Sequence, residues 1–375
     1  MADVEIGRGR TARQGYDLSD VAIVPSRRTR DVDEVSVAWE IDAFRFEIPM
    51  VAHPSDATMS PPTVIEIGRL GGLGVLNAEG LWTRYGDPQP VYDELLAAAA
   101  DVDSATAVIQ RAYAEPVKPD LIAERIGQIR EAGVTVAVRL SPQHTLTLAN
   151  TVLDAGVDLL VIQGTIVSAE HVSTDVEPLN LKTFIADLDV PVIVGGCANY
   201  QTALHLMRTG AAGIIIGIGA DYLSTTTEVL GIHVPMATAI ADAAAARRDY
   251  LDETGGRYVH VIADGDLHTS GDIAKALACG ADAVMLGAAI ADASETPGRG
   301  AWWESVAAHP ALPRGHVGIP PDNHKELESF ARLLHGPDHS AEGRTNLFGG
   351  LKRAMAKCGY SDLKAFQKVE LVHRY

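Results

Sequence analysis

Several features that mark membrane, zinc-binding and nucleic-acid-binding proteins are absent from this sequence. No apolar run approaches the roughly 20 residues that a bilayer-spanning helix needs, and the polar N-terminus lacks the apolar segment of a signal peptide. The three cysteines, Cys197, Cys279 and Cys358, form no CxxC pair and lie near no histidine at metal-ligand spacing. Lys and Arg number 31 against 49 acidic residues, and the net charge of −18 argues against contacts with a phosphate backbone. We therefore expect a reduced, cytoplasmic protein with no metal site, no membrane association and no nucleic-acid partner.

The order of apolar runs predicts the fold. Short β-branched runs alternate with helical patterns along most of the chain, and several of those patterns end in glycine just before the next run, as a helix C-cap should. Such βαβ units build a parallel sheet, and eight of them predict a (β/α)8 TIM barrel, with a doubly wound open sheet as the alternative. The eight expected strands are Ile48–His53, Gly72–Ala78, Val134–Leu140, Leu159–Gln163, Val192–Gly195, Gly213–Ile218, Val259–Asp264 and Val284–Gly287.

Two segments depart from this repeat within a chain that we expect to be one domain, 1–375, with its barrel core at 15–297. Residues 81–121 separate the second and third strands and carry a helical pattern. Residues 298–346 follow the eighth strand, are rich in Pro, His and Gly, and predict a loop or flap-like excursion. Residues 347–369 are expected to form C-terminal helices.

Polar and glycine-rich signals follow six of the expected strands, at the barrel end where chemistry is usually found. One glycine after a strand is ordinary turn chemistry, but six such signals in order predict a ligand site. Asp264 is the strongest candidate, because a carboxylate at the barrel mouth can accept two hydrogen bonds from a ribose diol; the alternative is an Asp that caps the next turn. The six signals are His53 to Asp56, Gln163 to Thr165, Gly195 to Cys197, Gly217 to Ser224, Asp264 to Asp266, and Gly287 with Ala288.

Four stretches carry a resemblance to a known family. The loop GIIIGIGADYLSTTTEVLGIHVPMATAIA (213–241) resembles the catalytic loop of the IMP dehydrogenase/GMP reductase family. GYDLSDVAIVPS (15–26), IPMVAHPSDATMS (48–60) and residues 262–298 are similar to other family segments, and the resemblance extends over about 15–366. Residues 81–121 are too short for the CBS domains that most IMP dehydrogenases insert there. The resemblance implies a barrel that binds a purine nucleotide (IMP, GMP or XMP), uses NAD or NADP, and assembles as a homotetramer.

The resemblance also implies roles for single residues. The family cysteine that attacks the purine falls at Ser224, and Thr226 matches a threonine that helps to activate water or the leaving amine. Asp264 matches the ribose-binding Asp. The remaining matched or neighbouring positions are Gly265, Gly287, Ser55 and His53 for the substrate, and Gln163, Gly217 and Gly219 for the cofactor.

Several of these positions carry unusual residues. Ser224 needs a strong base to act as a nucleophile, and 217–229 contains no His or Lys. Cys197 could substitute as the nucleophile or be a small buried residue, and Glu342 could supply an acid or be a solvated loop residue. Gln163 replaces a cofactor-binding Asp, and Ser55 replaces a Met that stacks on the base.

The phosphate site departs from the family as well. Asp266, Ala288 and Tyr222 stand where the family has a Gly and two Ser, and a carboxylate at position 266 would repel a phosphate. Either His53 or Arg27 and Arg28 hold the phosphate, or the ligand is not a typical mononucleotide. Two hypotheses follow: a weak or inactive NAD(P)-dependent oxidoreductase on IMP or GMP, or a non-catalytic nucleotide-binding or regulatory subunit that joins an active paralogue in a hetero-oligomer.

Overall fold

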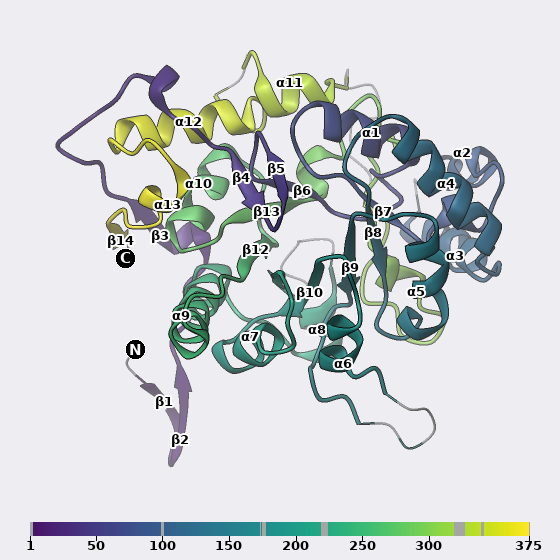
Figure 1. The fold of residues 1–375 in the computed structure, drawn as a ribbon, viewed down its shortest axis with the longest axis horizontal. Coiled ribbons are helices and arrows are strands. Elements are labelled where there is room, and N and C mark those ends of the chain that lie inside the picture. Colours follow the sequence, from purple (N-terminus) through teal and green to yellow (C-terminus); the bar gives the residue numbers. More distant parts are fainter. Residues whose placement is uncertain are drawn as a thin grey trace.

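The protein is a closed parallel barrel. The computed structural model describes residues 3–98, 101–172, 174, 178–218, 224–318, 327–338 and 341–374, and helices surround the strands (Figure 1). The eight parallel strands follow the order β6-β13-β12-β11-β10-β9-β8-β7. Their bounds are β6 Met50–Ala52, β7 Val75–Asn77, β8 Ala137–Leu140, β9 Leu159–Gln163, β10 Val192–Cys197, β11 Gly213–Ile216, β12 His260–Asp264 and β13 Ala283–Leu286.

Backbone hydrogen bonds close the sheet. Ala52 N donates to Leu73 O at 2.7 Å, and Leu73 N donates to Met50 O at 2.9 Å, so the first strand meets the chain that leads into β7. An open sheet would leave these edges unpaired. The predicted TIM barrel is therefore confirmed, and the open-sheet alternative is wrong.

The helices form because apolar stripes face the barrel and cap signals mark their ends. Thr269 and Asp272 form a reciprocal capping box at the start of α10 (Ser270–Ala278). Gly133, Gly156, Gly210 and Gly280 adopt positive φ just after helices, as the C-cap pattern predicts. The other helices around the barrel are α1 Pro61–Arg69, α4 Pro119–Glu131, α5 Thr145–Asp154, α6 Leu181–Ala186, α7 Tyr200–Met207, α8 Thr226–Leu230 and α9 Met236–Thr254, and α11 Phe330–His335, α12 Leu347–Lys357 and α13 Leu363–Phe366 follow them in the chain.

The segments that interrupt the repeat build a second apolar core. Residues 81–121 carry α2 (Gln89–Ala97) and α3 (Val102–Tyr113). Their buried side chains pack against residues 298–318, which we call the post-barrel segment. The rings of Tyr92 and Trp303, for example, lie 6.2 Å apart. Residues 298–318 of the predicted excursion are thus packed against the insertion, whereas α11, which belongs to the same excursion, packs in the main core. Residues 319–326, 339 and 340 of the excursion lie outside the described part of the chain.

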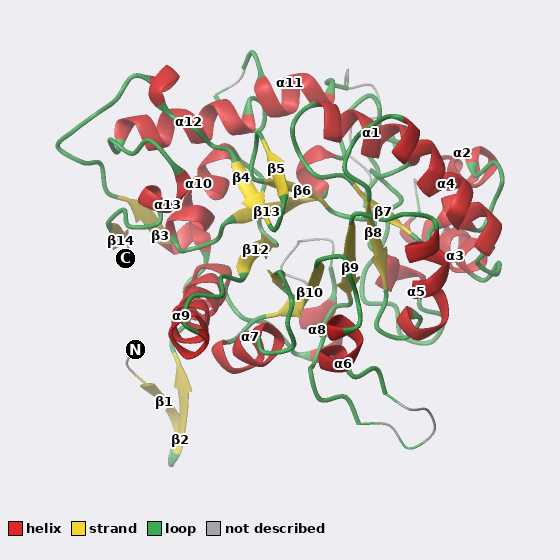
Figure 2. Cartoon of the chain, in the orientation of Figure 1, coloured by secondary structure: helices red, strands yellow, loops and turns green. Residues whose placement is uncertain are grey.

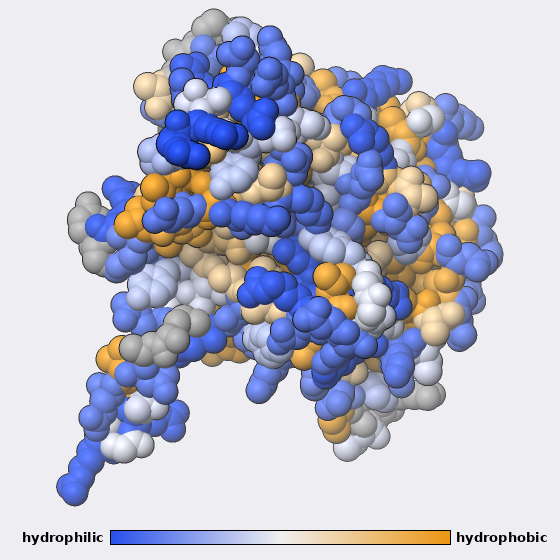
Figure 3. Space-filling view, turned by 60° about the vertical axis from the view of Figure 1, so that its left-hand side comes forward, coloured by the Kyte–Doolittle hydropathy of each residue, from blue (hydrophilic) through white to orange (hydrophobic). Residues whose placement is uncertain are grey.

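Short strand pairs complete the fold (Figure 2). The hairpin of β4 (Trp39–Ile41) and β5 (Phe44–Phe46) covers the N-terminal end of the barrel, where the fully buried Ile41 reaches the start of β11. This leaves the C-terminal strand ends as the open end. β3 (Val21–Ile23) pairs with β14 (Leu371–His373). The hairpin of β1 (Asp3–Gly7) and β2 (Arg10–Arg13) projects as a largely hydrophilic arm (Figure 3).

The described helices carry no membrane-spanning candidate: none of them combines the length and the apolar character that crossing a bilayer requires. Within the same residues, no group of three or more His, Cys, Asp or Glu side chains has a metal-binding arrangement.

Candidate active site at the barrel mouth

A pocket lies at the C-terminal ends of the strands. The space within it is about 840 Å³ when the open mouth is included. The post-barrel segment forms one wall. Six of the predicted site residues line the pocket: His53, Gln163, Gly217, Asp264, Gly265 and Gly287.

Two predicted ribose-binding side chains contact each other in this pocket. The Gln163 Nε2 group, at the end of β9, donates to Asp264 Oδ2 at 3.1 Å, at the end of β12. Nε2 also lies 3.4 Å from the Met285 sulfur. Gln163 Oε1 is buried and has no hydrogen-bond partner among the described residues. Asp264, predicted to bind the substrate, and Gln163, predicted to bind the cofactor, therefore contact each other. The Gln163 Oε1 atom remains available as an acceptor.

His53 contributes a neutral ring to the same wall. Its Nε2 lies 4.0 Å from Asp264 Oδ2, and its ring meets the Trp302 ring edge-on at 5.2 Å. Burial, assisted by the nearby Arg139 guanidinium, lowers the pKa of His53 to about 3. His53 is therefore uncharged near neutral pH and does not offset the charge of a phosphate. Arg27 and Arg28 are exposed and do not line the pocket.

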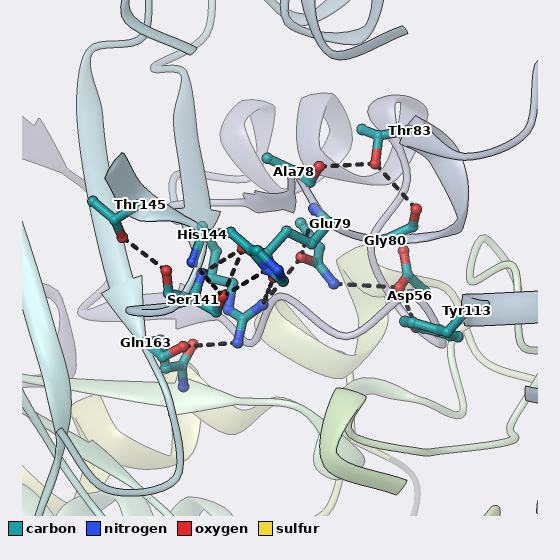
Figure 4. A network of polar contacts seen from close by, with 12 residues as sticks. Asp56, Ala78, Glu79, Gly80, Thr83, Tyr113, Ser141, His144, Thr145 and Gln163 are labelled. Carbon is teal, nitrogen blue, oxygen red and sulfur yellow. Dashed lines mark hydrogen bonds and ion pairs between the residues drawn. The ribbon is translucent and has the colours of Figure 1, made fainter. Parts of the chain in front are cut away.

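A buried ion-pair network supports the pocket from the side of β7 and β8 (Figure 4). Arg139 Nη2 donates to the Gln163 carbonyl at 2.7 Å, and Arg139 Nη1 lies 3.5 Å from Glu79 Oε2. The other Glu79 oxygen accepts from Ser141 N and Oγ, both at 2.8 Å, and His144 Nδ1 lies 3.2 Å from Oε2. Burial would raise the pKa of Glu79, but Arg139 and Ser141 hold it below the ordinary value. This network fixes the end of β9, from which Gln163 projects.

Arg139 and Glu79 were not among the predicted site residues. The available signal was a guanidinium within the otherwise apolar strand Val134–Leu140. A charged side chain in such a run requires a buried partner. That partner, Glu79, follows β7, and the sequence does not show that it lies beside Arg139.

Gly217 is required by the backbone geometry of the mouth. Its φ is +146°, and a Cβ atom added there would lie 1.6 Å from the Asp264 carbonyl oxygen. The ends of β11 and β12 therefore approach more closely than any side chain would allow. Gly219 and Tyr222 lie outside the described residues.

Ser224 and Thr226 lie together but do not line the pocket. Ser224 Oγ is 3.2 Å from Thr226 Oγ1, and both residues are buried. Ser224 forms a backbone bridge with Gly315, and Thr225 N donates to Arg314 O at 2.7 Å, so this end of the loop is attached to the post-barrel segment. The described contact of the Ser224 hydroxyl is another hydroxyl, which is no base for its activation.

Ser55 also lies outside the pocket lining. Its Oγ donates to the Trp303 carbonyl and accepts from Ala57 N at 3.1 Å, so its hydroxyl holds the post-barrel segment against the barrel. The next residue, Asp56, accepts hydrogen bonds from the Tyr113 hydroxyl and from Leu81 N (Figure 4). Burial, opposed by these hydrogen bonds, raises the pKa of Asp56 to about 6.

The two alternative catalytic side chains lie in contrasting environments. Cys197 is buried, its sulfur is 3.6 Å from the Ile215 carbonyl oxygen, and burial raises the pKa of the thiol to about 12. It is therefore protonated near neutral pH, which favours the structural interpretation. Glu342 is exposed, and its carboxylate lies 3.7 Å from Arg344.

The chain is similar to known proteins over most of its length. Residues 15–310 match the IMP dehydrogenase / GMP reductase domain. An uncharacterized oxidoreductase of Mycobacterium tuberculosis is 61% identical, over 98% of this chain and 99% of that protein. The inosine-5′-monophosphate dehydrogenase of Methanocaldococcus jannaschii is 30% identical over 64% of this chain and 50% of its own length. A crystal structure of an IMP dehydrogenase/GMP reductase-like protein from Corynebacterium glutamicum superposes with a TM-score of 0.94, at 54% identity and covering 99% and 98% of the two chains.

Proposed function

Because the chain belongs to the IMP dehydrogenase/GMP reductase family, we propose that its barrel mouth binds a purine ligand such as IMP, GMP or XMP, or a closely related compound, and that redox turnover of this ligand is weak or absent. The observation that carries the proposal is the environment of Ser224. A family-type reaction needs a nucleophile that adds to the purine ring. Among the described residues the contact of the Ser224 hydroxyl is the Thr226 hydroxyl, which is not a base that would generate an alkoxide.

The binding half of the proposal rests on Asp264. Its carboxylate stands at the end of β12 in the pocket wall, and Gln163 orients it through a hydrogen bond. A carboxylate so placed accepts from the two hydroxyls of a ribose. The buried Oε1 of Gln163 offers a further acceptor, which also suits the ribose of NAD or NADP. When bound, that cofactor would accept or supply a hydride; the side chains present here would orient it.

The same serine favours a second candidate function. A purine-binding subunit without a thiol could join a cysteine-bearing paralogue in a hetero-oligomer and regulate it. Size-exclusion chromatography of the two proteins, mixed and separate, tests this: a new mixed peak with altered turnover of the paralogue supports it, whereas independent elution with unaltered turnover contradicts it.

Turnover is the first expected result. The turnover rate of the purified protein is measured from nicotinamide absorbance, with IMP and NAD or with GMP and NADPH. It should be at least about 100-fold lower than that of a cysteine-bearing relative, because the covalent step lacks its thiolate. Ser224→Ala should leave any residual rate unaltered. A robust rate that Ser224→Ala abolishes would show that the serine is a working nucleophile.

Ligand binding is the second expected result. Asp264→Ala should weaken purine binding at least tenfold in calorimetry, because the ribose loses a charged acceptor. The matched control is Asp103→Ala on the exposed side of α3, which removes an equal charge at a residue that does not line the pocket. Unaltered binding in the Asp264 variant would refute the ribose assignment.

A further inference from the structure

One residue of the pocket wall carries a buried polar atom that has no partner in the fold. Trp302 of the post-barrel segment is 3% exposed and lines the pocket, and its indole Nε1 has no hydrogen-bond partner among the described residues. Buried N–H groups are normally paired with protein, water or ligand, so this atom requires an explanation. An indole N–H is a donor only, and whatever pairs it must therefore supply a lone pair.

The fold holds this indole in a defined place. The backbone of Trp302 exchanges hydrogen bonds of 2.8 and 2.9 Å with Gly318, which fixes the chain beside the ring. A Cβ atom added to Gly287 would lie 2.1 Å from Cη2 of Trp302, so the six-membered ring packs on that glycine. Because Nε1 belongs to the five-membered ring, this packing does not use the N–H.

His53 connects the indole to the proposed ribose position. Its ring meets the Trp302 ring edge-on at 5.2 Å, and its Nε2 lies 4.0 Å from Asp264 Oδ2. Asp264 accepts from Gln163, whose buried Oε1 is an acceptor without a partner among the described residues. The wall thus presents an acceptor beside Asp264 and, beyond His53, a donor. A nucleotide that places its ribose at Asp264 and Gln163 can reach Trp302 with its base.

The edge of the purine determines which base suits a donor. IMP, GMP and XMP carry a 6-oxo group, which accepts a hydrogen bond, whereas adenine carries a 6-amino group, which donates one. A 6-oxo group would pair the Trp302 N–H. A 6-amino group would set two donors against each other and leave both unpaired in a buried position, which is unfavourable.

We propose that Trp302 selects 6-oxopurines over 6-aminopurines by donating its Nε1 hydrogen to the 6-oxo group. The proposal rests on the proposed function, because it assumes a purine ligand at the barrel mouth, and it names the residue that sets the class of base. Nucleotides of the two classes can carry the same ribose and the same phosphate, so the preference concerns the base alone.

Calorimetry with IMP, GMP and AMP on the full chain tests the proposal. The wild type should bind IMP and GMP at least about tenfold more tightly than AMP. Trp302→Phe keeps an aromatic ring at this position but removes the N–H, so it should weaken IMP binding about tenfold. It should change AMP binding by no more than about twofold, because AMP makes no hydrogen bond to the indole. The preference for IMP should therefore disappear in this variant.

Trp39→Phe is the matched control. Trp39 lies in β4 at the other end of the barrel, and its Nε1 already donates to His260 Nδ1 at 3.2 Å. The same substitution there should leave the ratio of IMP to AMP affinity unaltered.

Two results would overturn the proposal and leave purine binding intact: equal affinities of the wild type for IMP and AMP, or an unaltered ratio in Trp302→Phe. If none of the three nucleotides binds, the proposed function itself is wrong, and the selectivity assigned to Trp302 is refuted with it.

Discussion

Asp282→Ala is expected to lower the free energy of unfolding by about 3–5 kcal/mol, because it leaves a buried guanidinium without its charge partner. Asp282 lies directly before β13 and is 2% exposed, and its Oδ2 forms an ion pair with Arg247 of α9. Its Oδ1 accepts from the Tyr258 hydroxyl at 2.6 Å, from Lys364 Nζ at 2.9 Å and from Gln367 Nε2 at 3.0 Å. One carboxylate thus joins the barrel to α9 and to the C-terminal segment.

The same carboxylate predicts a dependence of stability on pH. Burial alone would raise its pKa above the ordinary 3.8, but Arg247 and Lys364 outweigh burial and bring the pKa to about 2. A carboxyl whose pKa is lower in the folded state binds its proton first in the unfolded chain. Its contribution is therefore complete above about pH 4 and is lost as the pH falls towards 2. Urea unfolding across this interval should show a steeper loss for the wild type than for Asp282→Ala.

The matched control for Asp282→Ala is Lys364→Ala. This variant removes a partner whose side chain is 57% exposed, and it should cost at most about 1 kcal/mol because water replaces the lost contact. An Asp282 variant that is no less stable than the Lys364 variant would contradict the assignment of Asp282 as a buried anchor.

Gly217→Ala is expected to destabilise the protein by about 3 kcal/mol or more and to abolish ligand binding. The new methyl group would lie 1.6 Å from the Asp264 carbonyl oxygen, and a φ of +146° is unfavourable for any residue with a side chain. Relief requires the end of β11 to move away from β12, which displaces Asp264 and Gly265. The Gly217→Ala variant should therefore show both a lower denaturant midpoint and a loss of purine binding in calorimetry.

Gly127→Ala is the comparison for this substitution. Gly127 lies within α4, and an added Cβ atom would meet nothing within 4 Å. Alanine is the better helix former, so this variant should be more stable by about 0.5–1 kcal/mol. If the two glycine variants unfold at similar midpoints, the close approach at the barrel mouth does not constrain position 217.

The barrel was predictable because each strand carries its own signal. Strands buried on both faces appear as continuous apolar runs, and β9 occupies the predicted residues Leu159–Gln163 without any shift. The bounds of other strands differ from the prediction by a few residues. The run Ile48–His53, for example, contains β6 at Met50–Ala52, because hydrogen bonds to the neighbouring strands, and not apolar character, decide where a strand ends. Asp282 was not predicted as a structural anchor, since its partners Arg247 and Lys364 come from distant helices.

Some of the residues that line the pocket were also predictable. Residues that follow strands converge at one end of a barrel, so His53, Gln163 and Asp264 were expected to meet, and all three line the pocket. Trp302 was not identified as a site residue, because nothing in its neighbourhood shows that the post-barrel segment returns to Gly287. The hydroxyl of Ser55 was assigned to the substrate side, where its chain position suggested a contact, and in the structure it is engaged with Trp303.

The barrel, the family and the end of the barrel that carries the pocket could be predicted from the amino-acid sequence, because periodicity, cap residues and motif spacing are local properties of the chain. Three properties of the pocket depend on the folded chain: the neutral state of His53, the pairing of Arg139 with Glu79 and the position of Trp302 over Gly287. Those properties depend on burial and on distances between segments far apart in the chain, and such distances exist only once the barrel has closed.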